Sequence, residues 1–535
     1  MDIEFIKKQG DALFDGRSQL MSLWQEIAEN FYPERAIFTA SKEPGADFAN
    51  NLDTSYPVLV RRDLGNQIGG ILRPTNKEWM SLISKYDENI DTEGKQWLEW
   101  ATKVQKRAMY DPVAMFTRAT KEADHDWAAF GQTPITARLN LQENALLYRT
   151  WHLKDVAWKE DYKGEVETVY RKWNPDLYTL ASIFKDKCHK DVQEKCKKNP
   201  FDTIEVYHCE IPSSMYKDGF YADKYPLVSI YYDCKNNHVM EETGIMEGEY
   251  VIPRWQTISG SQYAFSPATI CALPDARTIQ SVARVLLEAS EKHITPPMVA
   301  VQEAIRGDIS VYAGGITWVD SEYDERLGEV LRELDQKGNL PIGFEMNTDL
   351  RSILSEAFYL NKLALPQPEP NMTAYEASQR VEEYIRQALP LFEPMEDEYN
   401  SKLCNKTFNI LMRAGAFGTP QSIPKSLQGK EIGFRFESPM REATDRIKGQ
   451  RFTETKEMIA SAMELDSTAG YVVDPVVALR DVLDAIGSPS KWRRSEQAVS
   501  ELKQQAIETQ QNQQTMTDMQ QGTDIAKTAN DAGLL

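Results

Sequence analysis

The sequence predicts an α+β protein that is mainly helical. Apolar residues recur at helical spacing over most of 1–130 and again from residue 274 onward. The stretch 133–260 instead holds short runs rich in Val, Ile, Tyr, Thr and Trp, which are typical of strands. With 535 residues, the chain also exceeds the size at which one hydrophobic core usually splits, so we expect several domains.

The first 130 residues are expected to form helices over 1–35 and 57–75, and a pair of helices over 92–130. Apolar side chains in the first of these recur at roughly helical spacing: Phe5, Leu13, Leu20, Leu23, Trp24, Ile27, Ala28 and Phe31. Pro33 should end that helix, and Gly69, Gly70 and Pro74 should end the second. The intervening SKEPGADFANNLDTSYP is rich in turn formers and is expected to be a loop.

The β-rich stretch contains six runs separated by Asn, Asp, Gly and Pro. They are ITARLNL, LLYRTWHL, EVETVYRKW, TIEVYHCEI, PLVSIYYD and EYVIPRW. A helical insertion near 177–198 interrupts them and carries the basic run KDKCHKDVQEKCKK, which we interpret as a solvated helix face.

Helical character returns at Pro274, where Asp275 is favourably placed near a helix start and good helix formers follow. Thr295-Pro296-Pro297 should end this helix. Residues 298–345 read as a small mixed module with strand-like runs ISVY and ITWV and a charged helix near 322–336. A second helix is expected over about 347–363.

The segment ALPQPEPNM, residues 364–372, carries three prolines in five positions and cannot form a regular helix. Thr373 and Glu376 then form a capping box that begins a long helix with an apolar stripe, which Pro390 and Pro394 should kink or divide. Residues 440–500 read as a separate helical region. The Gln-rich stretch from about 504 has few large apolar groups and is expected to be mobile or to order only on binding.

Charge and cysteine content limit the classes of function. The 81 acidic residues outnumber the 61 basic ones, giving a net charge of −20, whereas a protein that grips DNA needs a basic surface. An acidic wall would repel a DNA duplex and let it slide, although solubility alone also explains such a charge. Six scattered cysteines do not resemble a disulfide framework and favour a reducing compartment. We expect neither a signal peptide nor a membrane span.

A search for catalytic motifs finds little. The chain has no GxxxxGK[ST], no GxGxxG after a strand, no HExxH and no paired CxxC. One group of possible metal ligands has a spacing that matches no zinc pattern and is interpreted as free thiols and ordinary histidines: Cys188, His189, Cys196, His208 and Cys209. The acids of 318–335 lack the ligand alternation of an EF-hand. We expect no cofactor and no metal.

Asp124-His125-Asp126 could suggest a metal-dependent nuclease, because carboxylates and imidazole suit such ions. The triplet lies on an expected helix beside Trp127, and adjacent residues of a helix do not face one way. The three side chains therefore cannot converge on one ion without help, and we keep the nuclease only as an alternative.

The order of elements is more informative than any motif: a helix, a small module, a returning helix, a proline-rich loop and a long helix. Five segments occur in the order found in one known family. They are LWQEIAENFYPERAIF (23–38), DLGNQIGGILRPTNKEWMSL (63–82), AAFGQTPITARL (128–139), GSQYAFSPATICALPDARTIQ (260–280) and NMTAYEASQRVEEYI (371–385). From about residue 20 to 415 the chain thus resembles the portal proteins, or head-to-tail connectors, of short-tailed bacteriophages.

The resemblance implies a portal fold with wing, stem, clip and crown regions assembled as a ring around a channel. Its regions, in chain order, would be a wing (1–273), a first stem helix (274–297), a clip (298–345), a second stem helix (346–363), a tunnel loop (364–372), a long wing helix and return (373–439), a crown (440–500) and a flexible Gln-rich tail (501–535). Twelve copies would carry twelve times the charge of −20, which suits passage of a polyanion without adhesion.

The resemblance further implies a function without a catalytic step. A dodecameric ring at one capsid vertex would serve double-stranded DNA packaging, retention and ejection. Its partners would be the DNA, the major capsid and scaffolding proteins, the large terminase and then a tail adaptor and the tail, with no membrane. The protein would reside in the virion, and in the host cytoplasm during assembly.

The resemblance also implies roles for three groups of residues. The tunnel loop would face DNA and resist its backward slipping, through Leu365, Pro366, Gln367, Pro368, Glu369, Pro370 and Asn371. Stem charges would touch phosphates or pair between subunits, through Arg277, Arg284 and Lys292. Clip residues would dock the terminase or adaptor, through Arg306, Asp308, Asp320 and Glu322. The competing interpretation of the loop is a plain interhelical connector.

The sequence leaves two other classes of function open. One is the nuclease using Asp124 and Asp126, which plasmid cleavage with magnesium or manganese would reveal. The other is a helical scaffold without a channel, which differs from a portal in forming no ring.

Overall fold

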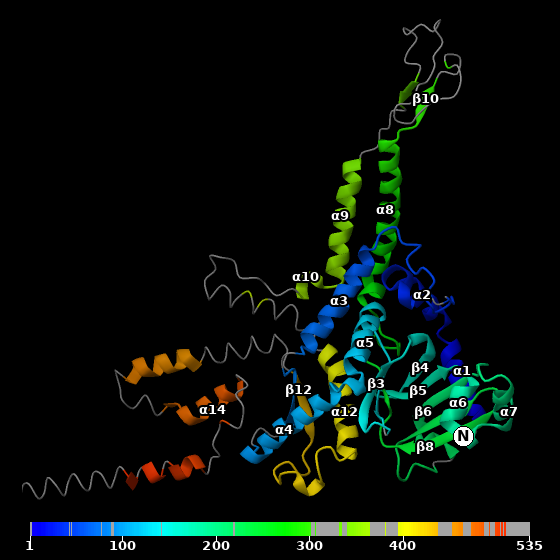
Figure 1. Ribbon diagram of the computed structural model, residues 1–535. Coiled ribbons are helices and arrows are strands. Elements are labelled where there is room, and N and C mark those ends of the chain that lie inside the picture. Colours follow the sequence, from blue (N-terminus) through cyan, green and yellow to red (C-terminus); the bar gives the residue numbers. More distant parts are fainter. Residues whose placement is uncertain are drawn as a thin grey trace, which may run out of the picture. The chain divides into compact units, whose positions relative to one another are not determined.

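The architecture is that of a computed structural model (Figure 1). The structure describes residues 3–41, 43, 45–75, 78–86, 90–140, 142–217, 220–300, 305, 331–333, 340–363, 380, 383, 394–436, 452–463, 472–485, 492, 498–502, 504–506 and 508–509. The chain divides into two compact units, and each draws on distant stretches of the sequence. The first comprises Met1–Arg73, Met115–Arg138 and Leu147–Lys402, and the second comprises Pro74–Ala114, Leu139–Leu146 and Leu403–Leu535.

The first unit contains a five-stranded antiparallel sheet with strand order β4-β5-β6-β7-β8. Its strands are β4 (Val156–Glu160), β5 (Val166–Trp173), β6 (Val206–Pro212), β7 (Leu227–Asp233) and β8 (His238–Ile245). The three inner strands coincide with runs that the sequence predicts. The two edge strands, β4 and β8, were not predicted. Strand β4 is a short run of five residues that ends in Lys159 and Glu160, and β8 contains Glu241 and Glu242 side by side, so neither shows a clear β pattern.

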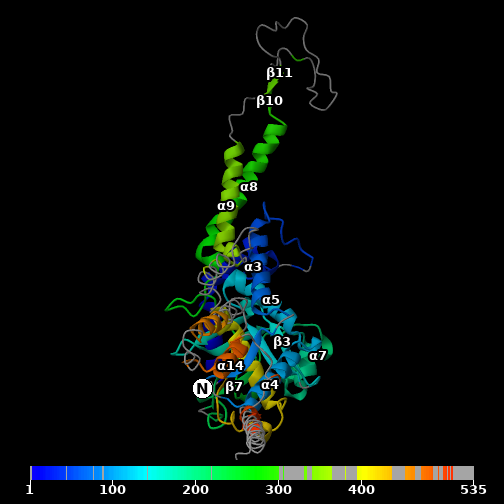
Figure 2. The same cartoon turned by 90° about the vertical axis from the view of Figure 1, so that its left-hand side faces the viewer.

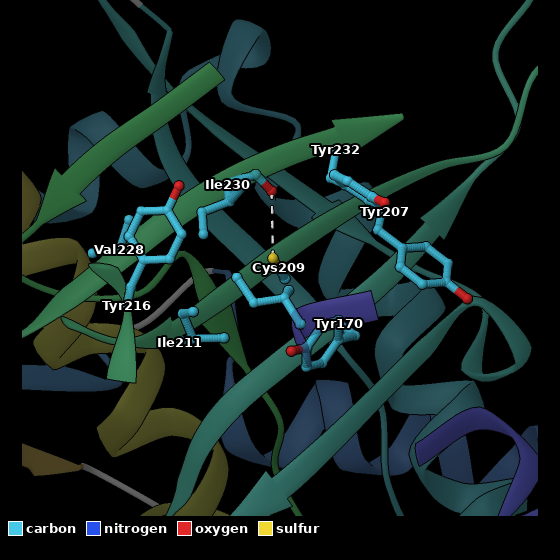
Figure 3. Close-up of a cluster of buried hydrophobic side chains, with 9 residues drawn as sticks. Tyr170, Tyr207, Cys209, Ile211, Tyr216, Val228, Ile230 and Tyr232 are labelled. Atoms are coloured by element: carbon cyan, nitrogen blue, oxygen red, sulfur yellow. Dashed lines mark hydrogen bonds between the residues drawn. The ribbon is translucent and has the colours of Figure 1, made fainter. Parts of the chain in front are cut away.

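One face of this sheet packs against helix α1 (Ile3–Asp15). The shared buried cluster consists of Ile6, Tyr170, Tyr207, Cys209, Ile211, Tyr216, Val228, Ile230 and Tyr232. Figure 3 shows Tyr170, Cys209 and Ile230 on neighbouring strands, with the Cys209 thiol directed at the Ile230 carbonyl oxygen, 3.7 Å away. Two phenols also fasten the helix. Tyr170 donates to Gln9 at 3.0 Å, and Tyr207 donates to Asp11 at 2.7 Å.

The opposite face of the sheet is covered at one end by α6 (Leu177–Phe184) and α7 (Lys190–Lys198), joined by the short turn Lys185–Lys187. The predicted helical insertion over 177–198 is therefore confirmed. Its apolar residues meet the sheet in a second cluster that consists of Leu177, Leu180, Phe184, Cys188, Val192, Ile204, Val206 and Met240.

The remainder of that face meets a smaller sheet with strand order β3-β2-β9. Its strands are β2 (Ile135–Asn140), β3 (Ala145–Thr150) and β9 (Tyr250–Val251). The Tyr250 hydroxyl links the two sheets, because it accepts a hydrogen bond from Arg171 Nε at 2.9 Å and lies 2.7 Å from His208 Nδ1. Arg171 and His208 are paired residues of β5 and β6, so they share this face.

The predicted helix over 1–35 is two helices, α1 and α2 (Ser18–Phe31), followed by the turn Pro33–Arg35. The break falls at Arg17, whose side chain is buried. Its guanidinium donates to the carbonyl oxygens of Leu153 and Val156 at 2.8 and 2.6 Å. The helix breaks here so that one arginine can hold the turn Leu153–Asp155, which leads into β4.

The helix predicted over 57–75 is confirmed as α3 (Tyr56–Leu72), which continues through Gly69 and Gly70 and ends just before Pro74. The reason is its packing against α5 (Phe116–Phe130). A Cβ atom at Gly65 would overlap the His125 ring, and one at Gly69 would lie 2.9 Å from Asp124 Oδ2. The glycines therefore permit close helix packing.

Helix α8 (Leu273–Ile294) follows the π-helical turn η7 (Ala268–Ala272) and packs alongside α9 (Leu340–Ala357), as Figures 1 and 2 show. The helix predicted to begin at Pro274 and end at Thr295-Pro296-Pro297 is confirmed as α8. The second helix begins seven residues earlier than the expected 347, with Pro341 in its first turn, a position that proline favours. Between the helices, β10 (Met298–Ala300) pairs with β11 (Leu331–Glu333). The predicted charged helix near 322–336 is wrong at 331–333, because these residues pair as a strand.

The second unit contains β1 (Met80–Ser84) paired antiparallel with β12 (Ile432–Phe436), together with α4 (Thr92–Met109). Strand β1 was not predicted, whereas the helix pair α4 and α5 over 92–130 is confirmed. Helix α12 (Lys402–Arg413) contributes most of its length to this unit. Aromatic residues fill the core, with Trp79 stacked on Phe436 and Trp97 against Phe417.

The remaining described elements lie toward the carboxyl end or are short turns. Most of the long helix expected after Thr373, with Pro390, lies outside the described residues. Pro394 is helical and is followed by the π-helix η10 (Met395–Ser401) and α12, so the predicted kink or division stays a prediction. Helix α14 (Pro475–Ala485) confirms the predicted DPVVALRDVLDAIG helix. The others are η2 (Pro112–Ala114), η5 (Ser213–Met215), α10 (Leu360–Leu363) and η11 (Pro420–Ser422). No helix in the described ranges has the length and apolar character needed to cross a bilayer.

Candidate functional site

The hairpin of α8 and α9 is largely exposed to solvent. By the α-helical rise per residue, its 22 and 18 residues are about 33 and 27 Å long. A Cβ atom at Gly343 of α9 would overlap Leu286 of α8, so glycine allows the two helices to approach closely there. The hairpin is therefore a packed pair that leaves the body of the first unit (Figure 2).

The base of the hairpin is fastened to the first unit by polar contacts. Gln280 Oε1 accepts from the backbone N–H groups of Asp53 and Thr54, both at 2.8 Å. The Tyr56 hydroxyl lies 2.6 Å from Ser355 Oγ and donates to the Arg351 carbonyl at 3.0 Å. The segment before α3 thus holds both helices. Sequence reasoning missed these contacts because they join residues more than 220 positions apart.

Two of the three predicted stem charges form ion pairs within the chain. Arg277 Nε lies 2.5 Å from Glu26 Oε1, and Arg284 Nη2 lies 2.9 Å from Asp53 Oδ2. Lys292 is exposed in the last turn of α8. The three cations therefore follow α8 from its base to its end, and the two nearer the base already have carboxylate partners.

Most of the hairpin is not covered. In α8 the buried residues are Leu273, Ala276 and Ile279, all in the first two turns, and in α9 they are Leu350 and Leu354. Large apolar side chains elsewhere on the pair are 40 to 79% exposed: Val285, Leu287, Ile294, Ile342, Phe344, Met346 and Ile353. Residues two apart on a helix, such as Val285 and Leu287, point to nearly opposite sides, so these side chains lie on more than one side of the hairpin. Apolar exposure of this extent is typical of interaction surfaces. We call these seven residues the stem patch.

The predicted tunnel-loop residues Leu365 to Asn371 lie outside the described residues. So do the predicted clip residues Arg306, Asp308, Asp320 and Glu322. The strand pair β10–β11 does show that the chain beyond α8 returns toward α9. The roles of both groups remain predictions.

The Asp124-His125-Asp126 triplet on α5 makes structural contacts with arginines. Asp124 forms a buried ion pair with Arg73, and Asp126 accepts from Nε and Nη2 of Arg35, each at 2.9 Å. His125 lies 3.1 Å from Arg61 Nη1. The three neighbours therefore contact three arginines from different places in the chain, as expected for residues that face different ways on a helix.

Burial is the main cause of the pKa shifts of these three residues. It raises the pKa of Asp126 to about 6 against the opposing effect of Arg35, and it raises the pKa of Asp124 against that of Arg73. Burial, then Arg61, lowers the pKa of His125 to about 4. Within the described ranges, no three metal-ligating side chains lie close enough to hold an ion. This holds both for the triplet and for the Cys–His group of 188–209. The geometry gives the nuclease alternative no support.

Comparison with known proteins extends over nearly the whole chain. Residues 4–493 match the family described as bacteriophage head to tail connecting proteins. The chain is 24% identical over 537 residues to a protein named probable portal protein of Bordetella phage BPP-1, covering 95% of this chain and 92% of that protein. It is 22% identical over 456 residues to the portal protein of Salmonella phage epsilon15, covering 83% and 80%.

Proposed function

Because the chain belongs to the family of bacteriophage head to tail connecting proteins, we propose that it is the subunit of a portal ring. The ring has twelve copies, occupies one capsid vertex and surrounds a channel for double-stranded DNA. The stem patch is the observation that carries this proposal. Its seven apolar side chains are exposed in the single chain, and neighbouring copies of the same hairpin would cover them.

The proposed function assigns each region of a portal to a part of this chain. Helices α8 and α9 form the stem, and the residues between them form a clip that docks the large terminase and later the tail adaptor. The two sheets and the helices around them form the wing, which contacts the major capsid and scaffolding proteins. The helical region 440–500 forms the crown. No step of this function is catalytic, because the terminase supplies the energy for packaging.

The charge of the chain suits a conduit. A net charge of −20 per copy gives a ring a strongly negative field, which disfavours tight adhesion of DNA phosphates to the wall. The proline-rich loop, residues 364–372, projects toward the duplex and resists its backward movement. Its prolines limit the conformations of the chain and so keep the loop stiff.

Negative-stain electron microscopy of the purified chain, with native mass spectrometry as a check, tests the proposal directly. We expect rings with a central hole and a mass near twelve copies. A monodisperse monomer or dimer at all protein concentrations would contradict it. Rings of thirteen would retain the portal function and correct only the number of copies.

A further inference from the structure

Two arginines stack on one tryptophan in the first unit, and the charges of two more act on one of them, although the chain as a whole is acidic. The four arginines come from four elements: Arg118 from α5, Arg138 from β2, Arg149 from β3 and Arg171 from β5. The guanidinium carbons of Arg149 and Arg171 lie 4.0 and 3.9 Å from the centroid of the Trp151 ring. We call these four residues the arginine cluster.

The backbone brings the cluster together through strand alternation. Thr136 and Arg138 share one face of β2, and the Trp151 indole N–H donates to Thr136 Oγ1 at 3.1 Å. Arg149, two residues before Trp151, therefore lies on the same side. Arg171 reaches this place from the larger sheet, with its Nε held by the Tyr250 hydroxyl at 2.9 Å.

The charges of the cluster are not neutralised within the described part of the chain. None of the four arginines forms an ion pair there, and Arg171 is only 5% exposed. Asp155 interacts with Arg171 only through its charge, and two other acids near the cluster are engaged elsewhere. Glu122 pairs with Arg35 at 2.8 Å, and Glu210 accepts from the backbone N–H of Glu249 at 2.8 Å. Only Arg171 is a buried cation without a carboxylate, which is costly, whereas Arg118, Arg138 and Arg149 are exposed. The cluster therefore presents positive charge to solvent at one place, where an anion can bind.

The other arginines act unfavourably on the charge of Arg149. Burial lowers the pKa of Arg149, and Arg171, Arg138 and Arg118 lower it further, with only Glu122 opposing them. Stacking on Trp151 contributes attraction through the ring face, but it supplies no negative charge. An anion bound from solution would supply that charge.

We propose that the arginine cluster is a binding site for phosphate oxyanions, and that its ligand is the backbone of double-stranded DNA. Guanidinium groups bind phosphate oxygens in a bidentate manner. A DNA strand presents a regular row of neighbouring charges, which matches several adjacent cations better than one protein carboxylate does. Because the arginines already stack on Trp151, its ring does not stack on bases, and the contact is independent of sequence.

The existence of an anion site rests on the geometry, whereas the choice of DNA rests on the proposed function. The site would be a local point of adhesion on a protein whose overall charge repels DNA. It would hold a segment of duplex beside the wing without requiring a basic surface elsewhere.

The test compares two double variants of equal net charge in the full chain. Arg138→Gln/Arg149→Gln removes two charges from the cluster. Arg62→Gln/Lys163→Gln removes two exposed charges outside it. Binding of a fluorescent 30-base-pair duplex is measured by anisotropy over a series of salt concentrations, and inorganic phosphate is tested by thermal shift against chloride at equal ionic strength.

We expect the cluster variant to bind the duplex at least about tenfold more weakly and with a salt slope shallower by about two, or one per lost phosphate contact. The control variant should bind like the unmodified chain. Equal losses in both variants, or no loss in either, would overturn the proposal. Arg149→Lys should retain most of the salt slope, because it keeps the charge.

Two further outcomes separate the sources of the anion. Stabilisation by phosphate that depends on the cluster, with duplex binding unchanged, would overturn the DNA ligand and leave a site for free phosphate. Loss of the assembled mass in the cluster variant alone, without any effect of either anion, would overturn the phosphate site in favour of carboxylates from another copy. If the unmodified chain forms no ring, the portal proposal fails while the duplex comparison stays interpretable.

Discussion

At the scale of single residues, arginines organise the first unit. Arg17 holds a turn, Arg35 and Arg73 neutralise the two aspartates of α5, and Arg61 contacts the histidine between them. Arg73 also donates to Asn400 at 2.7 Å and lies over the Tyr399 ring, so it fastens the π-helix η10 to α5. Acids that suggest catalysis in the sequence are therefore parts of the core.

Replacing Asp124 by Asn should strongly destabilise the chain, because Arg73 would remain as a buried cation without its partner. We expect the free energy of unfolding to fall by about 3–5 kcal/mol, measured by urea denaturation. The matched control is Asp63→Asn, which breaks an exposed pair with Arg62 and should cost about 0–1 kcal/mol. Equal effects of the two substitutions would contradict the assigned role of Arg73–Asp124.

His152 should make stability depend on pH. Its Nδ1 accepts from the Lys154 N–H at 3.1 Å, and its Nε2 lies 3.3 Å from the Arg35 carbonyl, so the folded state favours the neutral ring. Burial, then the charge of Arg35, lowers its pKa to about 3 from 6.5. Its contribution to stability is complete above pH 6.5 and is lost as the pH falls toward 3.

Between pH 7 and pH 5 this loss should amount to about 2 kcal/mol. His152→Gln should therefore reduce the difference in urea midpoint between the two pH values, because an amide does not titrate. His293→Gln, at an exposed position of α8, should leave that difference unchanged. If the two variants behave alike, His152 does not carry the effect.

At the scale of elements, the hairpin and the sheets differ in how they are stabilised. The five-stranded sheet is covered by α1 on one face and by α6, α7 and β9 on the other, so it has its core within one chain. The hairpin buries apolar residues only near its base. A helix pair of this length needs further packing, because helical stability in proteins comes mainly from tertiary contacts.

Placing charge in the stem patch should prevent assembly without unfolding the chain. Leu287→Glu/Phe344→Glu replaces side chains that are 63 and 56% exposed, so the thermal midpoint of the single chain should change little. We expect monomers by native mass where the unmodified chain forms rings. Tyr162→Glu, at a position 91% exposed outside the hairpin, is the control and should assemble normally. Rings formed by the stem-patch variant would show that other surfaces drive assembly.

At the scale of the whole molecule, the proposed ring explains features that look unfavourable in one chain. The excess of acids and the exposed stem patch both suit the proposed conduit. The arginine cluster is a local region of positive charge on this acidic chain. We propose that its charge attracts an anion from outside the described residues.

Deleting residues 365–371 should leave ring formation intact and impair retention of packaged DNA. The reason is that the stiff loop would otherwise oppose backward movement of the duplex, while the stem patch that drives assembly is unchanged. The measurement is DNA retained per particle after in vitro packaging, beside the ring mass of the variant. Normal packaging and retention would show that the loop is only a connector.

The sequence by itself determined the mixed helical fold, the inner strands, α8 and the family, because these depend on local periodicity and on segments that keep their order. Tertiary structure decided where the glycines of α3 serve packing, where β1, β4 and β8 lie, and which arginine each residue of the α5 triplet meets. It also decided the stem patch and the arginine cluster. Both depend on contacts between residues far apart in the chain, and such contacts leave no local pattern that could be read beforehand.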